Sequence, residues 1–220
     1  GTYWLLFKLL IASERKVISC FSKMVRDNNQ KFNISKFTNN MLYLNPIFSV
    51  SRNTLRFTDV DIDNIKSLNL DIIIRGNIHG ILNGEIINSA KRGIIYINYG
   101  DKRFFRGGPP GFWEVYFRNP STGFSLQILS EDNDESCVVF RGEIPTRRIY
   151  TSNIFNLYID CNPYLAQFIL QHVCSNHFPS TIKEFPYGRP IFHEPTISQS
   201  VMYIFKTFLL LFYTVLIERY

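Results

Sequence analysis

Residues 93–118 have the sequence GIIYINYGDKRFFRGGPPGFWEVYFR, and this stretch decides the fold. It opens with four apolar residues, 94–97, which predict a buried strand. A polar, glycine-rich loop follows as far as Pro110, and a helix is expected from about Gly111. Strand, loop and helix in this order are typical of open α/β sheets, which place their ligands beyond the carboxyl ends of the strands. A long connection without a function of its own is the competing interpretation.

The segment before this stretch shows the same alternation. Thr58 has the character of an N-cap and predicts a short helix that ends near Leu68. Residues 70–75 include three consecutive isoleucines and predict a second strand that is buried on both faces. Residues 84–90 predict another short helix. This order favours an α/β fold with an open, mostly parallel sheet and helices on both faces.

The flanking segments supply further helices and strands. Apolar residues at helical spacing predict a helix over residues 3–26, and a short strand is expected within 42–50. Alternating apolar residues predict a strand at 124–128, and residues 138–140 suggest a neighbouring strand. Residues 150–174 are helical in pattern, but Asn162-Pro163 is a good N-cap and first-turn pair, so this segment is either kinked or two helices.

Composition and charge exclude several classes of protein. Of the 220 residues, 45% are hydrophobic, which indicates a globular rather than a disordered chain. The net charge of +6 is scattered along the sequence, whereas nucleic-acid binding usually shows a concentrated patch, so a nucleic-acid partner is not favoured. The four cysteines form no closely spaced pairs, which favours reduced thiols in a cytoplasmic protein over disulfides or a metal site.

The two ends of the chain suggest additional parts. The sequence begins with Gly1 inside a helical pattern, so we expect that a piece of the natural N-terminus is missing. Prolines recur from 179 to 195, and we divide the chain into an α/β domain (1–176), a linker (177–197) and an apolar helix (198–220). Three interpretations of residues 201–217 compete: a helix docked on the domain, a connector to a missing C-terminal domain, and an interfacial anchor. Membrane contact is the less favoured of these.

Two longer stretches resemble a known family. They are DIIIRGNIHGILNGEIINSAKRGIIYINYGDKRFFRGGPPGFWEV (71–115) and STGFSLQILSEDNDESCVVFRGEI (121–144). In order and spacing, their motifs are similar to the N-terminal domain of the formyltransferases that use 10-formyltetrahydrofolate. Methionyl-tRNA formyltransferase, glycinamide ribonucleotide formyltransferase and the sugar N-formyltransferases share this domain. The resemblance covers about residues 56–172 and is strongest to a bacterial branch whose members often continue into a further domain.

The resemblance implies a fold and a reaction. The fold is Rossmann-like, with a first strand that would precede Gly1. The reaction is transfer of a formyl group from 10-formyltetrahydrofolate to an amine of a small substrate, for which an amino sugar or nucleotide sugar is the best guess. In the family, an Asn, a His two residues later and an Asp from a later loop assist the attack of the amine and stabilise the oxyanion that forms.

The family's catalytic residues match this chain only in part. Asp134 takes the place of the late Asp. Counting back from Gly100-Asp101 puts Tyr99 in the place of the His and Ile97 in the place of the Asn, whereas a shift by one residue gives Asn98 and Gly100. Neither alignment supplies a His. The resemblance therefore indicates Asp134, Asn98 and Tyr99 as the candidate catalytic residues.

The remaining candidate residues and the alternative function also follow from the resemblance. The candidate cofactor-binding residues are Ile78, Gly80, Leu82, Asn133 and Glu135. The candidate substrate-binding residues are Asp101, Arg103, Arg106 and Gly107. His79 could lean across from the preceding loop, although an ordinary turn residue is the simpler interpretation. Because the His is absent, a domain that has kept the fold and lost the chemistry, serving as a binding or scaffold module, is the alternative.

Overall fold

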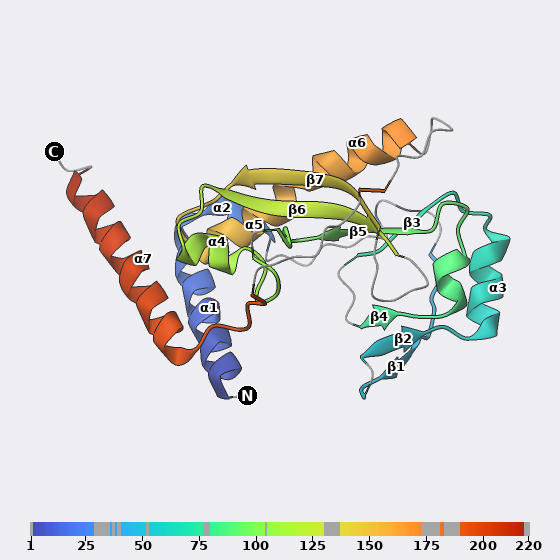
Figure 1. Cartoon of the computed structure of the whole chain (residues 1–220), viewed down its shortest axis with the longest axis horizontal. Helices are drawn as coiled ribbons and strands as arrows, with labels where there is room; N and C mark the ends of the chain where they lie inside the picture. The colour runs from blue at the N-terminus through green and yellow to red at the C-terminus, as the bar shows by residue number, and fades with distance from the viewer. Residues whose placement is uncertain are drawn as a thin grey trace.

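The computed structural model describes residues 2–28, 36, 38, 41–51, 53–76, 80–103, 105–129, 137–172, 181–182 and 190–217. It is an α/β structure with two sheets (Figure 1). The helices are α1 (Thr2–Phe21), α2 (Lys23–Asn28), α3 (Asp59–Ser67), the 3₁₀ helix η2 (Glu85–Asn88), α4 (Phe112–Tyr116), α5 (Tyr150–Asp160), α6 (Asn162–His172) and α7 (Ile197–Ile217). The strands are β1 (Ile47–Ser49), β2 (Thr54–Arg56), β3 (Ile73–Ile74), β4 (Ile81–Leu82), β5 (Ile94–Asn98), β6 (Ser121–Ile128) and β7 (Cys137–Pro145).

The strands form two mixed sheets. The larger has the order β3-β5-β6-β7, and the smaller has the order β1-β2-β4. Strand pairs β3·β5 and β2·β4 are parallel, whereas β1·β2, β5·β6 and β6·β7 are antiparallel. The predicted α/β class with helices on both faces is confirmed, but the sheets are mixed rather than mostly parallel.

The short helix α4 explains why β6 runs antiparallel to β5. A parallel connection needs a crossover that returns the chain to the starting edge of the sheet, usually by a helix as long as the strand. Helix α4 has only five residues and therefore rises about 7 Å. The chain thus stays at the edge where β5 ends, and β6 begins there, with Asn98 opposite Ser125.

Both faces of the larger sheet are covered by helices. Successive side chains of a strand point to opposite faces. Ile94 packs in a cluster with residues of α3 and η2, whereas the adjacent Ile95 packs with Phe168 of α6. Both isoleucines have no exposed surface. The run of apolar residues in β5 is therefore explained by burial on two sides, as the sequence predicts.

An aromatic cluster joins the terminal helices to the sheet. The ring of Phe112 lies 5.1 Å from Phe7 of α1, 5.4 Å from Tyr150 of α5 and 5.4 Å from Tyr203 of α7. The Tyr203 hydroxyl accepts a hydrogen bond from the Tyr150 N–H at 2.9 Å and donates one to the Glu14 carboxylate. One buried hydroxyl thus connects α1, α5 and α7.

Several predicted elements have the expected form, and others differ. Thr58 caps α3 with a full capping box, in which its hydroxyl accepts from the Asp61 N–H and the Asp61 carboxylate accepts from the Thr58 N–H. The helical pattern over 150–174 is two helices that meet at Cys161. The predicted N-terminal helix is divided at Ser22 into α1 and α2. Strands β2 and β4 were not predicted, because two or three residues are too few to show a period.

The C-terminal helix occupies residues 197–217 and lies at one side of the molecule in Figure 1. No helix in the described ranges is both long enough and apolar enough to cross a membrane. Much of the predicted linker lies outside the described residues. In the described part of the linker, Ile191 forms a β-bridge with Arg106, and the Phe192 N–H donates to the Arg106 carbonyl at 2.7 Å. The division into domain, linker and helix stays a prediction.

Candidate functional site

A cavity of about 400 Å³ lies where β5 ends and the glycine-rich loop leads to α4. Polar and aromatic residues from all three segments line it. They include Asn98, Tyr99, Arg106, Gly107, Trp113 and Glu114. This volume lies within the usual range of sites for small molecules. The position beyond the carboxyl end of β5 is the one that the sequence predicts for a ligand.

Asp101 fixes the loop that forms this cavity. Its side chain has no exposed surface, and its carboxylate accepts hydrogen bonds from the Arg103 N–H at 2.9 Å, from Arg103 Nε at 2.8 and 3.0 Å, and from Arg141 Nη1 at 3.1 Å. Burial alone would raise the pKa of Asp101, but the hydrogen bonds and charges of Arg103 and Arg141 outweigh it and lower the pKa. Asp101 therefore stays ionised and holds the loop to β7.

The four candidate substrate-binding residues divide into two pairs. Within the described part of the chain, Arg106 and Gly107 line the cavity, whereas Asp101 and Arg103 lie outside its lining. Gly107 has a φ of +86°, and a Cβ there would lie 2.5 Å from the Phe192 carbonyl oxygen. Only glycine fits this approach without strain. A role in substrate binding stays a prediction for all four residues.

Tyr99 is placed as a neutral hydrogen-bond donor. Its ring packs edge-on against Tyr158, with centroids 4.6 Å apart. Burial, with smaller effects from Cys161 and Tyr158, raises the pKa of Tyr99 to about 12. It therefore keeps its proton throughout the neutral range. Tyr99 also lines a smaller cavity of about 310 Å³, with Arg75, Gly76 and Asn162, near the ends of β3 and β5.

Glu114 was not among the candidate residues, although it lines the same cavity as Asn98 and Tyr99. Its side chain is almost completely buried, and this burial, together with the nearby charge of Asp101, raises the pKa of Glu114 to about 7. A carboxyl group with such a pKa can accept or release a proton near neutrality. The sequence contains a signal for it: one acidic residue lies within the apolar run Phe112, Trp113, Val115, where burial of a carboxyl is expected.

The indole of Trp113 presents an unsatisfied donor. Trp113 is 2% exposed, and its Nε1–H is buried with no partner among the described residues. A Cβ on Gly108 would lie 2.5 Å from this nitrogen, so glycine is what allows the loop to approach the ring. Buried polar groups are nearly always paired. A ligand with an acceptor atom in this cavity would supply the missing partner.

The candidate cofactor-binding residues lie in part outside the described residues. Ile78, Asn133 and Glu135 lie outside the described residues, as do the catalytic candidate Asp134 and the turn residue His79. Leu82 is buried in the apolar cluster of α3 and η2. Gly80 has a φ of +92°, and its carbonyl accepts a hydrogen bond from Arg75.

The ends of the predicted Asp134 loop lie near the beginning of β5. The Leu129 N–H donates to the Ile94 carbonyl at 2.9 Å, and Cys137 pairs with Ile128, which lies opposite Ile95. Tyr99 follows the other end of the strand, roughly 16 Å along it at 3.3 Å per residue. The meeting of Asp134 with Tyr99 stays a prediction, and Glu114 is the acidic residue that lines the cavity together with Tyr99.

No family model and no curated protein matches the chain. Among solved structures, it is similar to a sugar N-formyltransferase from Shewanella sp FDAARGOS_354, with 14% identity, a TM-score of 0.48, and coverage of 68% of this chain and 64% of that chain. It is also similar to the methionyl-tRNA formyltransferase from Clostridium thermocellum, with 16% identity, a TM-score of 0.44, and coverage of 69% and 67%.

A third similar structure is HypX from Aquifex aeolicus in complex with tetrahydrofolic acid, with 14% identity, a TM-score of 0.40, and coverage of 68% and 28%. The chain thus spans less than two thirds of the Shewanella protein and about a quarter of HypX.

Proposed function

We propose that this chain transfers a formyl group from 10-formyltetrahydrofolate to the amine of a small substrate, and that the cavity beyond β5 is where the amine reacts. The observation that carries the proposal is the grouping of two hydrogen-bond donors, Asn98 and Tyr99, with a carboxyl of near-neutral pKa, Glu114, in one cavity. The motif resemblance in 71–115 and 121–144 supplies the reaction class. The unsatisfied indole N–H of Trp113 supports a polar ligand in this place.

The residues have complementary roles in such a transfer. As the amine nitrogen bonds to the formyl carbon, negative charge develops on the formyl oxygen and a proton must leave the nitrogen. The Tyr99 hydroxyl and the Asn98 amide donate hydrogen bonds to that oxygen. Glu114, as carboxylate, accepts the amine proton and returns it to the nitrogen of the cofactor when the carbon–nitrogen bond there breaks. The proton count is therefore balanced, and Glu114 does the work for which the family uses its His.

The residues predicted from the sequence keep their roles in the proposal, and Glu114 is added to them as the group that moves the proton. Asp134 remains a candidate catalytic residue, and backbone atoms from Ile78 to Leu82, with Asn133 and Glu135, remain the candidate contacts of 10-formyltetrahydrofolate. Arg106 and Lys102 are the cations that line the cavity, and we assign Arg106, with its planar guanidinium, to a phosphate or carboxylate of the substrate. An amino sugar or nucleotide sugar fits this combination of amine and anion.

Transfer of an isotope label tests the proposal. The 220-residue chain is incubated with 10-formyltetrahydrofolate carrying a labelled formyl carbon and with a panel of amino sugars and nucleotide-linked amino sugars. We expect labelled amide with at least one acceptor, and an about 10- to 100-fold lower rate for Tyr99→Phe, because one oxyanion donor is lost. A folded chain that labels no acceptor above the rate without protein would contradict the proposal.

A binding module without chemistry is the second candidate. The observation that favours it is Tyr99 itself, because a hydroxyl with a pKa of about 12 cannot shuttle a proton as the family's His does. Calorimetry with tetrahydrofolate separates the possibilities. A module that has also lost the cofactor gives no heat of binding, and restoring the family residue with Tyr99→His then produces no activity.

The proposal also includes the cellular compartment of the protein and the division of its chain. The thiols of Cys20, Cys137 and Cys161 are free, which suits the reducing cytoplasm. We propose a cytoplasmic, bacterial protein in which residues 1–176 form the transferase-like domain and residues 177–197 lead to the C-terminal helix.

A further inference from the structure

A segment from a distant part of the chain forms one side of the cavity beyond β5. The described lining residues of this cavity all lie within 98–114, except for Ile191. Ile191 belongs to residues 190–196, which lead into α7 and are called the strap below. Figure 1 shows the chain before α7 passing beside the loop that leads into α4. The strap therefore borders the cavity although it lies far from the other lining residues in the sequence.

The strap is anchored by its backbone and by one aromatic ring. Ile191 forms a parallel β-bridge with Arg106, and the Phe192 N–H donates to the Arg106 carbonyl at 2.7 Å. The centre of the Phe192 ring lies 5.3 Å from that of Phe105 in the loop and 5.0 Å from that of Trp113 in α4. These contacts hold the strap against both the loop and the helix that line the cavity.

Two glycines of the loop allow the strap to approach closely. A Cβ on Gly107 would lie 2.5 Å from the Phe192 carbonyl oxygen and 3.1 Å from Ile191 Cγ2. Gly108 has a φ of +71°, and a Cβ there would lie 2.9 Å from the His193 carbonyl oxygen. These distances leave no room for a side chain on either glycine. The Ile191 side chain therefore lies close to the backbone of Gly107, which itself lines the cavity.

Ile191 is the neighbour of the cation to which the anion of the substrate is assigned. Paired strand segments lie about 4.8 Å apart, and both bridge partners, Ile191 and Arg106, line the cavity. The Ile191 side chain is 52% exposed, so it is available to contact a ligand. Because isoleucine is branched at Cβ, this side chain has little freedom to turn aside when a ligand binds.

The volume of the cavity favours a compact ligand. Its 400 Å³ lies near the lower end of the range for small-molecule sites, about 300–1,000 Å³. An amino sugar phosphate is much smaller than the same sugar linked to a nucleotide. Because the strap occupies the space beside Arg106, a nucleoside attached to an anion held there would meet Ile191.

We propose that Ile191 is a specificity-determining residue, which limits the size of the group attached to the anion of the substrate. Of the two classes of substrate that combine an amine with an anion, it favours an amino sugar phosphate over a nucleotide-linked amino sugar. This role rests on the proposed function, because Arg106 holds the anion of an amine substrate only if the amine reacts in this cavity.

Two acceptors of different size test the role of Ile191. Glucosamine 1-phosphate and UDP-glucosamine carry the same sugar and the same amine, and only the second carries a uridylyl group. Transfer of the labelled formyl carbon gives kcat/KM for each. We expect the wild type to prefer glucosamine 1-phosphate at least about tenfold. In Ile191→Ala this preference should fall about tenfold, mainly because kcat/KM for UDP-glucosamine rises in the wider cavity.

Ile182→Ala is the matched control. Ile182 also forms an isolated β-bridge, with Val138, and is 41% exposed, but it lines neither of the cavities that Tyr99 lines. It should leave the preference unchanged. A purely structural role of Ile191 would lower both rates alike and leave their ratio unchanged, so the ratio reports contact with the substrate. Melting temperatures show whether both variants are folded.

The results separate a failure of this role from a failure of formyl transfer. The role of Ile191 alone would be overturned by an unchanged preference in Ile191→Ala, by an equal change in Ile182→Ala, or by a wild-type preference for UDP-glucosamine. Labelling of another amine in the panel, but of neither glucosamine compound, would also reject this role alone. A folded wild type that labels no amine at all would overturn both proposals.

Discussion

Glu114 is buried and lines the same cavity as Tyr99. Its pKa is raised from 4.5 to about 7, so the folded state binds a proton more tightly than the unfolded state. The resulting stabilisation is fully present below pH 4.5 and is lost as the pH rises through 7. The shift corresponds to a loss of about 3 kcal/mol in the free energy of unfolding.

We expect Glu114→Gln to abolish this dependence on pH. The glutamine amide is neutral at every pH, as the protonated carboxyl is, so at pH 8 the variant should be about 3 kcal/mol more stable than the wild type. At pH 5 the difference should be less than about 1 kcal/mol. Urea denaturation at both pH values measures the difference. The control Glu85→Gln, which removes an exposed carboxylate paired with Lys66, should change stability by less than about 1 kcal/mol. Parallel curves for wild type and Glu114→Gln would contradict the assignment of a raised pKa.

Asp101 makes the opposite contribution. Its lowered pKa adds stability above its ordinary value of 3.8, and this stability is lost only in acid, outside the range in which Glu114 titrates. Asp101→Asn leaves Arg103 and Arg141 without their buried counter-charge and should cost about 3 kcal/mol in the free energy of unfolding. Asp71→Asn, which removes an exposed pair with Lys91, should cost less than about 1 kcal/mol. Denaturation at pH 7 compares them, and equal losses would show that Asp101 does not hold the loop.

Residues differ in how far the sequence can locate them. Asn98 ends the apolar strand β5 and Tyr99 follows it, so their place at the edge of the sheet could be predicted from the pattern alone. Glu114 could not be assigned a near-neutral pKa in this way. That property depends on the burial of the side chain and on the nearby charge of Asp101, and a single sequence does not report which side chains surround a carboxyl.

Among the elements, α7 depends on one hydroxyl for its attachment. Tyr203 is 2% exposed and bonds both Tyr150 and Glu14. Tyr203→Phe keeps the ring but leaves the Tyr150 N–H and the Glu14 carboxylate without this partner. The change should lower the free energy of unfolding by about 2 kcal/mol. Hydrogen exchange should become faster in α7 and in the first turn of α5. Tyr164→Phe changes a more exposed tyrosine of α6, 39% exposed, and should leave exchange in α7 unchanged. Unchanged exchange in Tyr203→Phe would mean that apolar packing alone holds α7.

Elements with strong local signals were the ones that could be predicted. The N-cap at Thr58 and the Asn162-Pro163 helix start are decided by neighbouring residues, and both appear in the structure. Strand direction is decided by distant parts of the chain. The short α4 leaves β6 at the edge where β5 ends, and nothing in the sequence of β6 itself indicates this direction.

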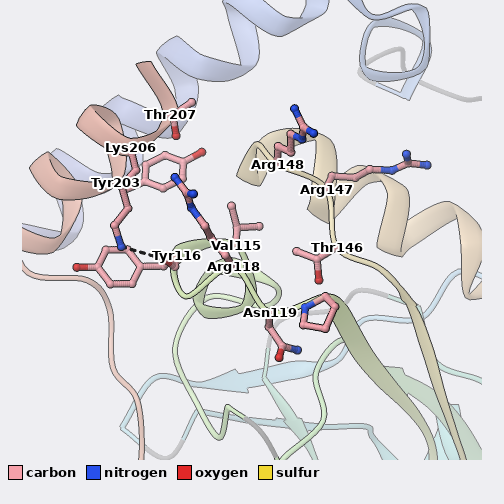
Figure 2. A pocket seen from close by; sticks show the side chains of 11 residues that line it. Val115, Tyr116, Arg118, Asn119, Thr146, Arg147, Arg148, Tyr203, Lys206 and Thr207 are labelled. Atoms are coloured by element: carbon pink, nitrogen blue, oxygen red, sulfur yellow. Dashed lines mark hydrogen bonds between the residues drawn. The ribbon is translucent and has the colours of Figure 1, made fainter. Parts of the chain in front are cut away.

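At the scale of the whole molecule, two cavities flank one short helix. The cavity beyond β5 combines donors with a titratable carboxyl. The other cavity, of about 480 Å³, lies between α4 and α7 and is lined by Arg118 and Lys206 among others (Figure 2). The two cavities share no lining residue, so the roles proposed for Asn98, Tyr99 and Glu114 concern the first cavity alone.

The pH profile of formyl transfer in the wild type and in Glu114→Gln tests the central assignment most directly. The account predicts that kcat/KM of the wild type rises through about pH 7 as Glu114 loses its proton and then becomes constant. It predicts that Glu114→Gln shows no such rise and is about 100-fold slower at pH 8. A Glu114→Gln variant with the wild-type rate and profile would contradict the account, because the carboxyl in the cavity beyond β5 would then have no part in moving the proton.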